Sequence, residues 1–279
     1  MRISPLLFVV GLSLAVGVVY PSHGQAPATK SAAFLPPNEA DIPKGPMGDS
    51  IRYGAKLLKQ TQIYAKNYVG NGLNCTSCHL NGGTTAYASP WVGIWGVFPE
   101  YRSRNGKVNT LEDRINDCLQ RSMNGKALPV DGDKMHAILS YMWWLSKGVP
   151  TGMDVDGRGF KRIKLPDPAR VDPAHGSQLY TEKCSACHGI DGQGQNAADG
   201  AYLFPALWGP KSFNIGAGMA RLSNAAAFTK SNMPLGSGDS LSDQDAMDIA
   251  AYFTRQPRPD FAAKSQDWPK GDKPADAPY

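Results

Sequence analysis

The pattern Cys-x-x-Cys-His occurs twice in this chain and constrains its fold more than any other sequence feature. The two copies consist of Cys75, Cys78 and His79, and of Cys184, Cys187 and His188. This is the attachment frame of c-type haem, in which two thiols form thioethers with the porphyrin and the adjacent histidine binds the iron. One isolated copy can be accidental, or it can be a redox pair or half of a zinc site. The surroundings of the two copies therefore decide the interpretation.

Both copies lie in the same order of predicted elements. A helical segment precedes each motif, a Gly/Pro-rich stretch follows, and an amphipathic helix rich in aromatic residues closes the unit, at residues 135–148 and 241–256. Ser242 followed by Asp245 predicts the start of the second closing helix. This repeat favours two covalently bound haem c groups. It also predicts a mainly α fold of two tandem class-I-like cytochrome c domains joined by a long irregular linker.

The N-terminus has the order of a secretory signal peptide. Arg2 is followed by an apolar run from Leu6 to about Tyr20 and by small residues near Gly24. We predict cleavage after Gly24. An uncleaved membrane anchor is the alternative, but the apolar run is shorter than the roughly 20 residues that a spanning helix needs. We therefore expect a periplasmic protein without a membrane segment after cleavage.

Composition shifts along the chain predict its domain boundaries. With the signal peptide at residues 1–24 removed, about 255 residues remain, which suggests two domains. We expect the N-terminal cytochrome c domain at 25–147, the Gly/Pro-punctuated linker at 148–172 and the C-terminal cytochrome c domain at 173–257. Residues 258–279 are polar and Pro-rich. They predict an irregular tail that is partly disordered.

The charge of the chain is mildly basic. The formal net charge of +5 falls to +4 when the signal peptide is removed, because only Arg2 is lost. No run of Lys or Arg resembles a nucleic-acid patch, so we expect no nucleic-acid partner. Pairing with an acidic electron carrier would agree with this charge.

The second haem needs a sixth iron ligand or an open position. Met233 is followed by proline and lies about 45 residues beyond His188, just before the closing helix, where small cytochromes c place their distal methionine. Met219 and Met247 are alternatives. Met247 falls on the apolar face of the closing helix, which favours a role in the core. We predict His188 and Met233 as the iron ligands, with Met219 as the main alternative.

The first unit contains no Met-Pro pair, but it contains the fifth cysteine. Cys118 lies about 39 residues beyond His79, which is close to the spacing of Met233 from its own motif. A thiolate binds iron well and lowers the reduction potential of a haem. The alternatives are an inert buried thiol and a site of intermolecular disulfide formation or modification. Other candidate ligands are Met123 and three residues for which packing in the closing helix is favoured, Met135, His136 and Met142.

The segment around Cys118 predicts an amphipathic helix with Cys118 on its inner side. Thr110 and Asp113 are spaced as an N-terminal cap. Arg114, Cys118 and Ser122 form one row at i, i+4 and i+8. The apolar residues on the same side are Leu111, Ile115 and Leu119.

Arginines gather around this row. Arg121 falls on the flank near Arg114, and Arg102 and Arg104 lie in the preceding loop. Guanidinium groups favour the thiolate form of a nearby cysteine and present fixed donor forks to a small oxyanion. Ordinary solvated charges or partners of the haem propionates are the alternatives for these arginines.

The block at residues 98–128, together with the two haem motifs and the Asn-Met-Pro-Leu-Gly loop at 232–236, resembles the dihaem thiosulfate dehydrogenases of the bacterial periplasm, also called tetrathionate synthases. The resemblance covers nearly the whole mature chain. The block around Cys118 is its specific part, because ordinary dihaem carriers lack it.

The resemblance implies a set of site residues. The first haem iron would bind His79 and Cys118, and the family's arginines and serine around that haem correspond to Arg104, Arg114 and Ser122. The second haem iron would bind His188 and Met233. Some members have a lysine directly before this methionine, where the present chain has Asn232. We therefore expect methionine ligation in both redox states, with Lys230 as an alternative ligand.

The resemblance also implies a reaction. Two thiosulfate ions would be joined to tetrathionate at a site made by Cys118, Arg104, Arg114 and Ser122. The electrons would pass from the first haem to the second and on to an external carrier, such as a small cytochrome c or a high-potential iron–sulfur protein. The same site could reduce tetrathionate. Two alternatives remain, a dihaem electron-transfer cytochrome without catalysis and the Cys-ligated cytochrome subunit of a thiosulfate-conjugating system.

Overall fold

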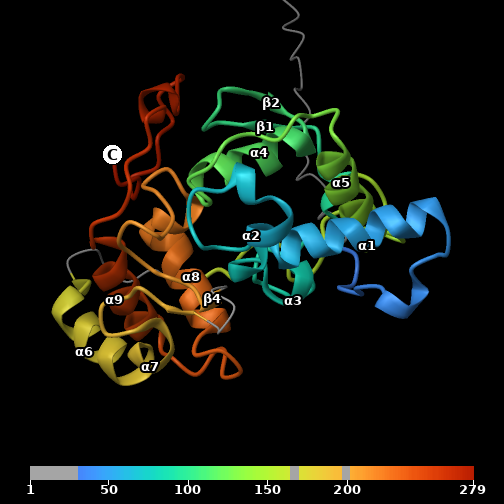
Figure 1. Ribbon diagram of the computed structural model, residues 1–279. Helices are drawn as coiled ribbons and strands as arrows, with labels where there is room; N and C mark the ends of the chain where they lie inside the picture. The colour runs from blue at the N-terminus through green and yellow to red at the C-terminus, as the bar shows by residue number, and fades with distance from the viewer. Residues whose placement is uncertain (1–30, 164–169, 197–201) are drawn as a thin grey trace, which may run out of the picture.

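The computed structural model describes residues 31–163, 170–196 and 202–279. The predicted signal peptide, residues 1–24, lies outside the described residues. The described chain is mainly helical and forms two neighbouring units, one blue to green and one yellow to red (Figure 1). None of the described helices is both long and apolar enough to cross a membrane.

The first unit is built on the crossing of α1 (Pro46–Lys59) and α5 (Asp133–Leu145). The two helices approach closely at Gly54, where a Cβ atom would lie 2.0 Å from the carbonyl oxygen of Ala137. Both helices bury their apolar faces in one core. Around the pair lie α2 (Thr61–Tyr64), α3 (Leu80–Gly83), α4 (Leu111–Arg121) and the antiparallel hairpin of β1 (Glu100–Arg102) and β2 (Lys107–Asn109).

The second unit places α9 (Asp243–Thr254) between α6 (Pro173–Lys183) and α8 (Leu222–Asn232). The predicted Ser242–Asp245 capping box is present at the start of α9. Buried aromatic and aliphatic side chains fill the core, including Tyr180, Ile249 and Phe253. The remaining elements are α7 (Ser185–His188), β3 (Gln195–Asn196) and β4 (Tyr202–Phe204). The described residues also form single 3-10 turns, namely η1 (Glu39–Asp41), η2 (Lys66–Tyr68), η3 (Cys75–Ser77), η4 (Ile94–Gly96), η6 (Gly218–Ala220) and η7 (Lys264–Gln266).

A pH-dependent contact joins α6 to α9. His175 Nδ1 lies 3.0 Å from Oδ2 of the buried Asp248, and this hydrogen bond raises the pKa of His175, with Asp245 and Asp172 adding smaller effects. The folded chain therefore binds this proton more tightly than the unfolded chain. The stabilisation is complete below the ordinary histidine pKa of about 6.5 and is lost as the pH rises through the raised value.

We accordingly expect the urea midpoint of the holoprotein to fall as the pH rises above about 6.5, and to fall less in His175→Gln. Far-UV circular dichroism at several pH values measures the midpoint. Equal pH dependence in the two proteins would contradict this assignment.

The linker and the two units pack together. A bridge between Ala88 and Phe160 joins the linker to the first unit, and the Phe160 ring packs edge-on against Phe228 of α8 at 6.1 Å between centroids. Next to it, Lys161 forms an ion pair with Asp239 at 2.8 Å. The linker thus contacts both units.

A loop of the second unit also docks on the end of α4. Asn71 and Asn124 of the first unit both donate side-chain hydrogen bonds to the carbonyl oxygen of Ser212, at 3.2 and 2.6 Å. The Asn214 amide group donates to the carbonyl oxygen of Gln120 at 3.0 Å. These bonds fix the second unit against the helix that carries Cys118.

The C-terminal tail is irregular and packs against the rest of the chain through specific contacts. It runs from α9 to the first unit, where it passes near the β1–β2 hairpin (Figure 1). The Trp268 amide donates to the carbonyl oxygen of Arg104 at 2.8 Å, and Trp268 itself is 6% exposed. Closer to the C-terminus, Asp276 forms an ion pair with Arg221 at 2.8 Å. A polar segment is ordered here because its acidic and aromatic residues find fixed partners.

Candidate haem and substrate sites

A cavity of about 600 Å³ opens in the first unit, between the first haem motif and α4. All the site residues predicted for this unit line it: Cys75, Cys78, His79, Arg104, Arg114, Cys118 and Ser122. The structure therefore brings together side chains from the motif, from the loop that carries Arg104 and from α4.

His79 is oriented by two contacts. Its Nδ1 lies 2.5 Å from the carbonyl oxygen of Ser89, and its ring stacks on Trp91 at 4.7 Å between centroids. Burial lowers the pKa of His79 to about 4, so the ring is neutral near pH 7. Because Nδ1 is engaged, Nε2 is the nitrogen available to iron.

The row predicted on α4 is present. The Thr110–Asp113 capping box begins the helix, and the buried residues Leu111, Ile115 and Leu119 line the same cavity as the row. Arg114 Nη1 donates to Cys118 Sγ at 3.0 Å. Electrostatic interaction with Cys118 raises the pKa of Arg114, while burial of the guanidinium opposes this shift. The guanidinium cation of Arg114 is therefore hydrogen-bonded to the sulfur of Cys118.

Arg104 reaches the same cavity from the loop that follows β1. Its Nη1 donates to the carbonyl oxygen of Gly216 at 2.5 Å, and its Nε lies 3.5 Å from Asp267 Oδ2. Its guanidinium stacks on the Trp268 ring, 4.6 Å from the centroid. Burial lowers the pKa of Arg104. Sequence reasoning missed Asp267 and Trp268, because nothing in a polar tail indicates which residues it contacts.

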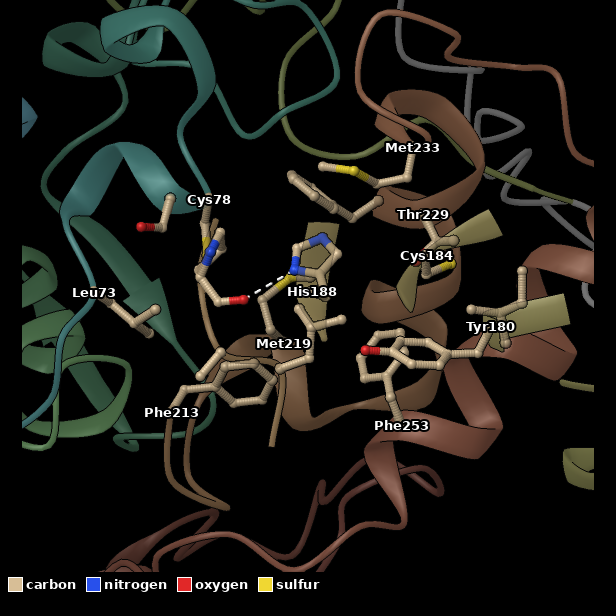
Figure 2. Close-up of a pocket in the computed structure, with 16 residues that line it drawn as sticks. Leu73, Cys78, Tyr180, Cys184, His188, Phe213, Met219, Thr229, Met233 and Phe253 are labelled. Atoms are coloured by element: carbon tan, nitrogen blue, oxygen red, sulfur yellow. Dashed lines mark hydrogen bonds between the residues drawn. The ribbon is translucent and has the colours of Figure 1, made fainter. Parts of the chain in front are cut away.

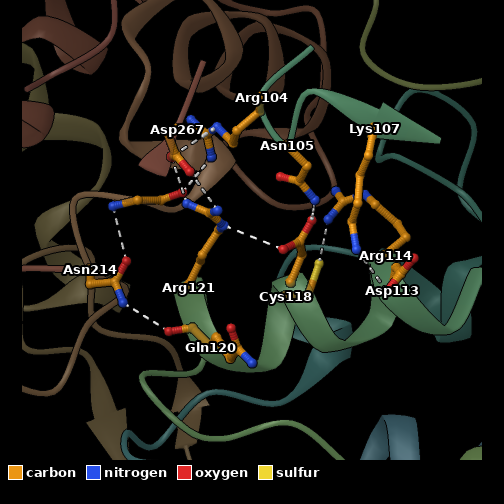
Figure 3. Close-up of polar contacts among 12 residues, drawn as sticks. Arg104, Asn105, Lys107, Asp113, Arg114, Cys118, Gln120, Arg121, Asn214 and Asp267 are labelled. Atoms are coloured by element: carbon orange, nitrogen blue, oxygen red, sulfur yellow. Dashed lines mark hydrogen bonds and ion pairs between the residues drawn. The ribbon is translucent and has the colours of Figure 1, made fainter. Parts of the chain in front are cut away.

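Arg121 does not join the cluster on Cys118, contrary to its position on the predicted helix. Asp267 receives two hydrogen bonds from it, at 2.7 and 2.8 Å (Figure 3). Arg121 is 8% exposed and also packs on the Phe261 ring at 4.3 Å. It therefore anchors the tail, and its side chain is turned away from Arg114.

The other candidate ligands of the first unit are placed differently. Met135 is fully buried in the core, as the packing interpretation predicted, whereas His136 is exposed, so the packing interpretation is wrong for His136. Met123 and Met142 are buried and line the cavity from its apolar side. Of the candidates that reach the cavity, Cys118 is the one that contacts a cation.

A second, smaller cavity of about 70 Å³ lies in the C-terminal unit (Figure 2). Cys184, His188, Met219 and Met233 line it, whereas Cys187 is exposed and does not. His188 Nδ1 lies 2.9 Å from the carbonyl oxygen of Pro205, which leaves Nε2 for iron as in the first unit. Burial lowers the pKa of His188. The donor set, rather than the enclosed volume, identifies this site.

The structure separates the alternatives to Met233. Lys230 donates to the carbonyl oxygens of Asp239 and Leu241 at 2.9 and 2.6 Å, so its ammonium group is engaged away from the cavity. Asn232 donates to the carbonyl oxygens of Tyr87 and Phe228, both at 3.2 Å. Met219 remains the alternative, since it lines both this cavity and the first one.

The two cavities share part of their lining. Leu73, Cys78 and Met219 contribute to both. Haem groups bound through the two motifs would therefore be separated by little more than these side chains.

The donor chemistry of both cavities fits haem c. Each combines motif cysteines, a neutral histidine whose Nδ1 is fixed by a backbone carbonyl oxygen, and a sulfur side chain, Cys118 in one and Met233 in the other. Cys75 and Cys78 would form the thioethers of the first haem, and Cys184 and Cys187 those of the second.

Comparisons with known proteins confirm the two domains. Residues 60–151 match the family "SoxA/TsdA, cytochrome c domain", and residues 173–255 match the family "Cytochrome c". The fold is therefore two tandem cytochrome c domains, and the chain carries two covalently bound haem c groups.

Curated relatives cover most of the chain. A thiosulfate dehydrogenase of Psychrobacter arcticus is 50% identical over 86% of this chain and 73% of its own length. A thiosulfate dehydrogenase of Allochromatium vinosum is 47% identical over 91% of this chain and 93% of its own length.

A solved structure has the same fold. The thiosulfate dehydrogenase TsdBA of Marichromatium purpuratum, in its "as isolated" form, superposes with a TM-score of 0.78 at 40% identity. The match covers 81% of this chain and spans 50% of the length of that protein.

Proposed function

The chain belongs to the thiosulfate dehydrogenase family and is thus a cytochrome c that oxidises thiosulfate, and from this premise we propose the site, the direction and the location of its reaction. Two thiosulfate ions bind in the cavity of the first unit, each loses one electron, and the sulfane sulfurs join to give tetrathionate. The two electrons pass through the second unit to an external carrier, a small cytochrome c or a high-potential iron–sulfur protein. The reaction takes place in the periplasm.

The observation that carries this proposal is the contact of Arg114 with Cys118 at 3.0 Å, in a cavity that Arg104 and Ser122 also line. Joining two dianions requires that their mutual repulsion be reduced. Fixed guanidinium groups do this, and their effect is larger in a partly buried site than in water. Plain electron-transfer cytochromes have no such requirement.

Each residue then has a proposed task. Arg104 and Arg114 bind and orient the sulfonate oxygens through their donor forks. Ser122 offers a hydroxyl donor from the end of α4. His79 and Cys118 hold the first haem iron, and His188 and Met233 hold the second. Held by these residues, the haem groups would supply the acceptors for the electrons of the reaction.

Turnover with an artificial acceptor tests the proposal. Purified dihaem protein should reduce ferricyanide when thiosulfate is added, with one tetrathionate formed for every two electrons. Reduced viologen with tetrathionate measures the reverse direction, and we expect it to be slower. No turnover in a protein whose two haems reduce with dithionite would instead support an electron-transfer cytochrome.

The ligand of the second haem can be tested separately. Met233→Gly should change the spectrum of that haem and slow electron delivery to the acceptor, because the thioether sulfur is lost. Met219→Leu is the matched control, since Met219 lines the same cavity and the substitution keeps its volume. We expect the control to keep the parent spectrum. A changed spectrum in Met219→Leu together with an unchanged one in Met233→Gly would reverse the assignment.

A further inference from the structure

Arg104 is fixed by parts of the chain that lie outside its own domain. Its Nη1 donates to the Gly216 carbonyl oxygen of the second unit at 2.5 Å, and its Nε faces Asp267 of the tail at 3.5 Å. The Trp268 ring covers one face of the guanidinium, 4.6 Å from its carbon. The side chain of Arg104 is 19% exposed. Figure 3 shows Arg104, Asp267 and Arg121 in one cluster above α4.

Asp267 is itself held rigidly. Its carboxylate is 3% exposed and receives two hydrogen bonds from Arg121 at 2.7 and 2.8 Å. The hydroxyl of Tyr279 also donates to it. Since Arg121 already balances its charge, Asp267 orients Arg104 without fully neutralising it.

The contacts leave part of Arg104 free for a ligand. A guanidinium has five N–H donors in a fixed fork. One Nη1 donor is used by Gly216, and Nε faces Asp267. The two Nη2 donors and the second Nη1 donor remain, on a side chain that lines the cavity.

We propose that the C-terminal tail completes the substrate site, with Asp267 and Trp268 as positioning residues that fix the Arg104 guanidinium for a sulfonate group. The inference rests on the proposed role of Arg104 in binding thiosulfate. An arginine on a hairpin loop otherwise samples many rotamers, and ordering it on binding weakens affinity. The tail orders it before the substrate arrives. Its effect should therefore appear in substrate binding more than in the maximal rate.

Asp267→Asn in the dihaem protein tests this directly. We expect KM for thiosulfate to rise about ten-fold, the size of one lost charge-assisted hydrogen bond, with kcat changed less than about two-fold. Calorimetric titration of the oxidised protein with tetrathionate should show a parallel rise in Kd without turnover. Asp260→Asn is the matched control, because that tail carboxylate pairs with Lys264 at 2.6 Å, whereas Arg104 contacts Gly216, Asp267 and Trp268. We expect the control to keep the parent KM and Kd.

A double-mutant cycle shows whether Asp267 acts through Arg104. In an Arg104→Gln background, Asp267→Asn should cost little further affinity, since the group that it positions is gone. If Asp267→Asn does not fold, Trp268→Leu replaces it, and we expect the same rise in KM and Kd.

Three results would overturn the proposal: an unchanged KM and Kd, a full ten-fold loss in the Arg104→Gln background, and tighter binding in Asp267→Asn. The last would mean that the carboxylate competes with the substrate. Failure of the parent protein to oxidise thiosulfate would overturn the proposed function itself. Normal turnover by the parent with unaltered variants would overturn the tail's role alone.

Discussion

Cys118→Gly is expected to lower thiosulfate turnover at least roughly a thousand-fold, the scale seen when a reacting side chain is removed. The substitution removes the sulfur that Arg114 contacts at 3.0 Å and the proposed ligand of the first haem iron. Both haems should stay attached, because Cys75, Cys78, Cys184 and Cys187 are untouched. Thiosulfate-dependent ferricyanide reduction, together with the haem content of the purified variant, measures both parts.

Cys118→Met separates iron ligation from thiolate chemistry. It restores a soft sulfur ligand but removes the negative charge and the nucleophile. We expect the first haem to remain six-coordinate with a raised reduction potential, since a thiolate lowers the potential and a thioether does not. Turnover should remain low. Parent-like activity in Cys118→Gly would show that Cys118 has only a packing role, and parent-like activity in Cys118→Met would show that the thiolate is not required.

Arg114→Gln is expected to lower kcat/KM for thiosulfate by about 10²- to 10³-fold. Arg114 supplies a half-buried cation at the sulfur of Cys118, and no other described arginine donates a hydrogen bond to that atom. Arg114→Lys keeps the charge but loses the planar fork, so we expect an intermediate loss. Steady-state kinetics at several thiosulfate concentrations measures these effects.

The control for the loss of a positive charge is Arg52→Gln. Arg52 lies on α1 and pairs with Asp49 at 2.7 Å, with both side chains largely exposed. An exposed pair of this kind contributes little, so activity should remain at the parent level. A loss in Arg52→Gln equal to that in Arg114→Gln would mean that net charge, rather than the local contact, governs the reaction.

The helix that carries Cys118 could be predicted because its determinants are local. A capping pair at Thr110 and Asp113 sets the start, and the helical period then places Cys118 on the inner side. The haem motifs are equally local, since five consecutive residues define each one. Contacts between residues that lie far apart in the chain have no comparable local sequence pattern.

The side-chain contacts of the C-terminal tail could not be predicted from the sequence. Asp267 and Arg121 are 146 residues apart, and a polar, Pro-rich segment has no period that would indicate a partner. The helical wheel correctly put Arg121 beside the row of Arg114, but its long side chain turns to the carboxylate that the tail provides. Order in the tail therefore arises from specific contacts rather than from composition.

The packing of the two units against each other could not be predicted from the sequence either. Their hydrogen bonds run through Asn71, Asn124 and Ser212, which lie in irregular segments without a recognisable pattern. The resulting close packing gives the two cavities a common wall at Cys78 and Met219. Haem groups bound in the two cavities would lie on opposite sides of this common wall.

The central claim is that thiosulfate reacts at the cavity that contains Cys118. The most direct test is anaerobic rapid mixing of the oxidised dihaem protein with thiosulfate, without an acceptor, while haem absorbance and the sulfur product are followed. We expect the parent protein to take up two electrons per tetrathionate formed and Cys118→Gly to stay oxidised. Reduction of Cys118→Gly at the parent rate, with tetrathionate as the product, would contradict it.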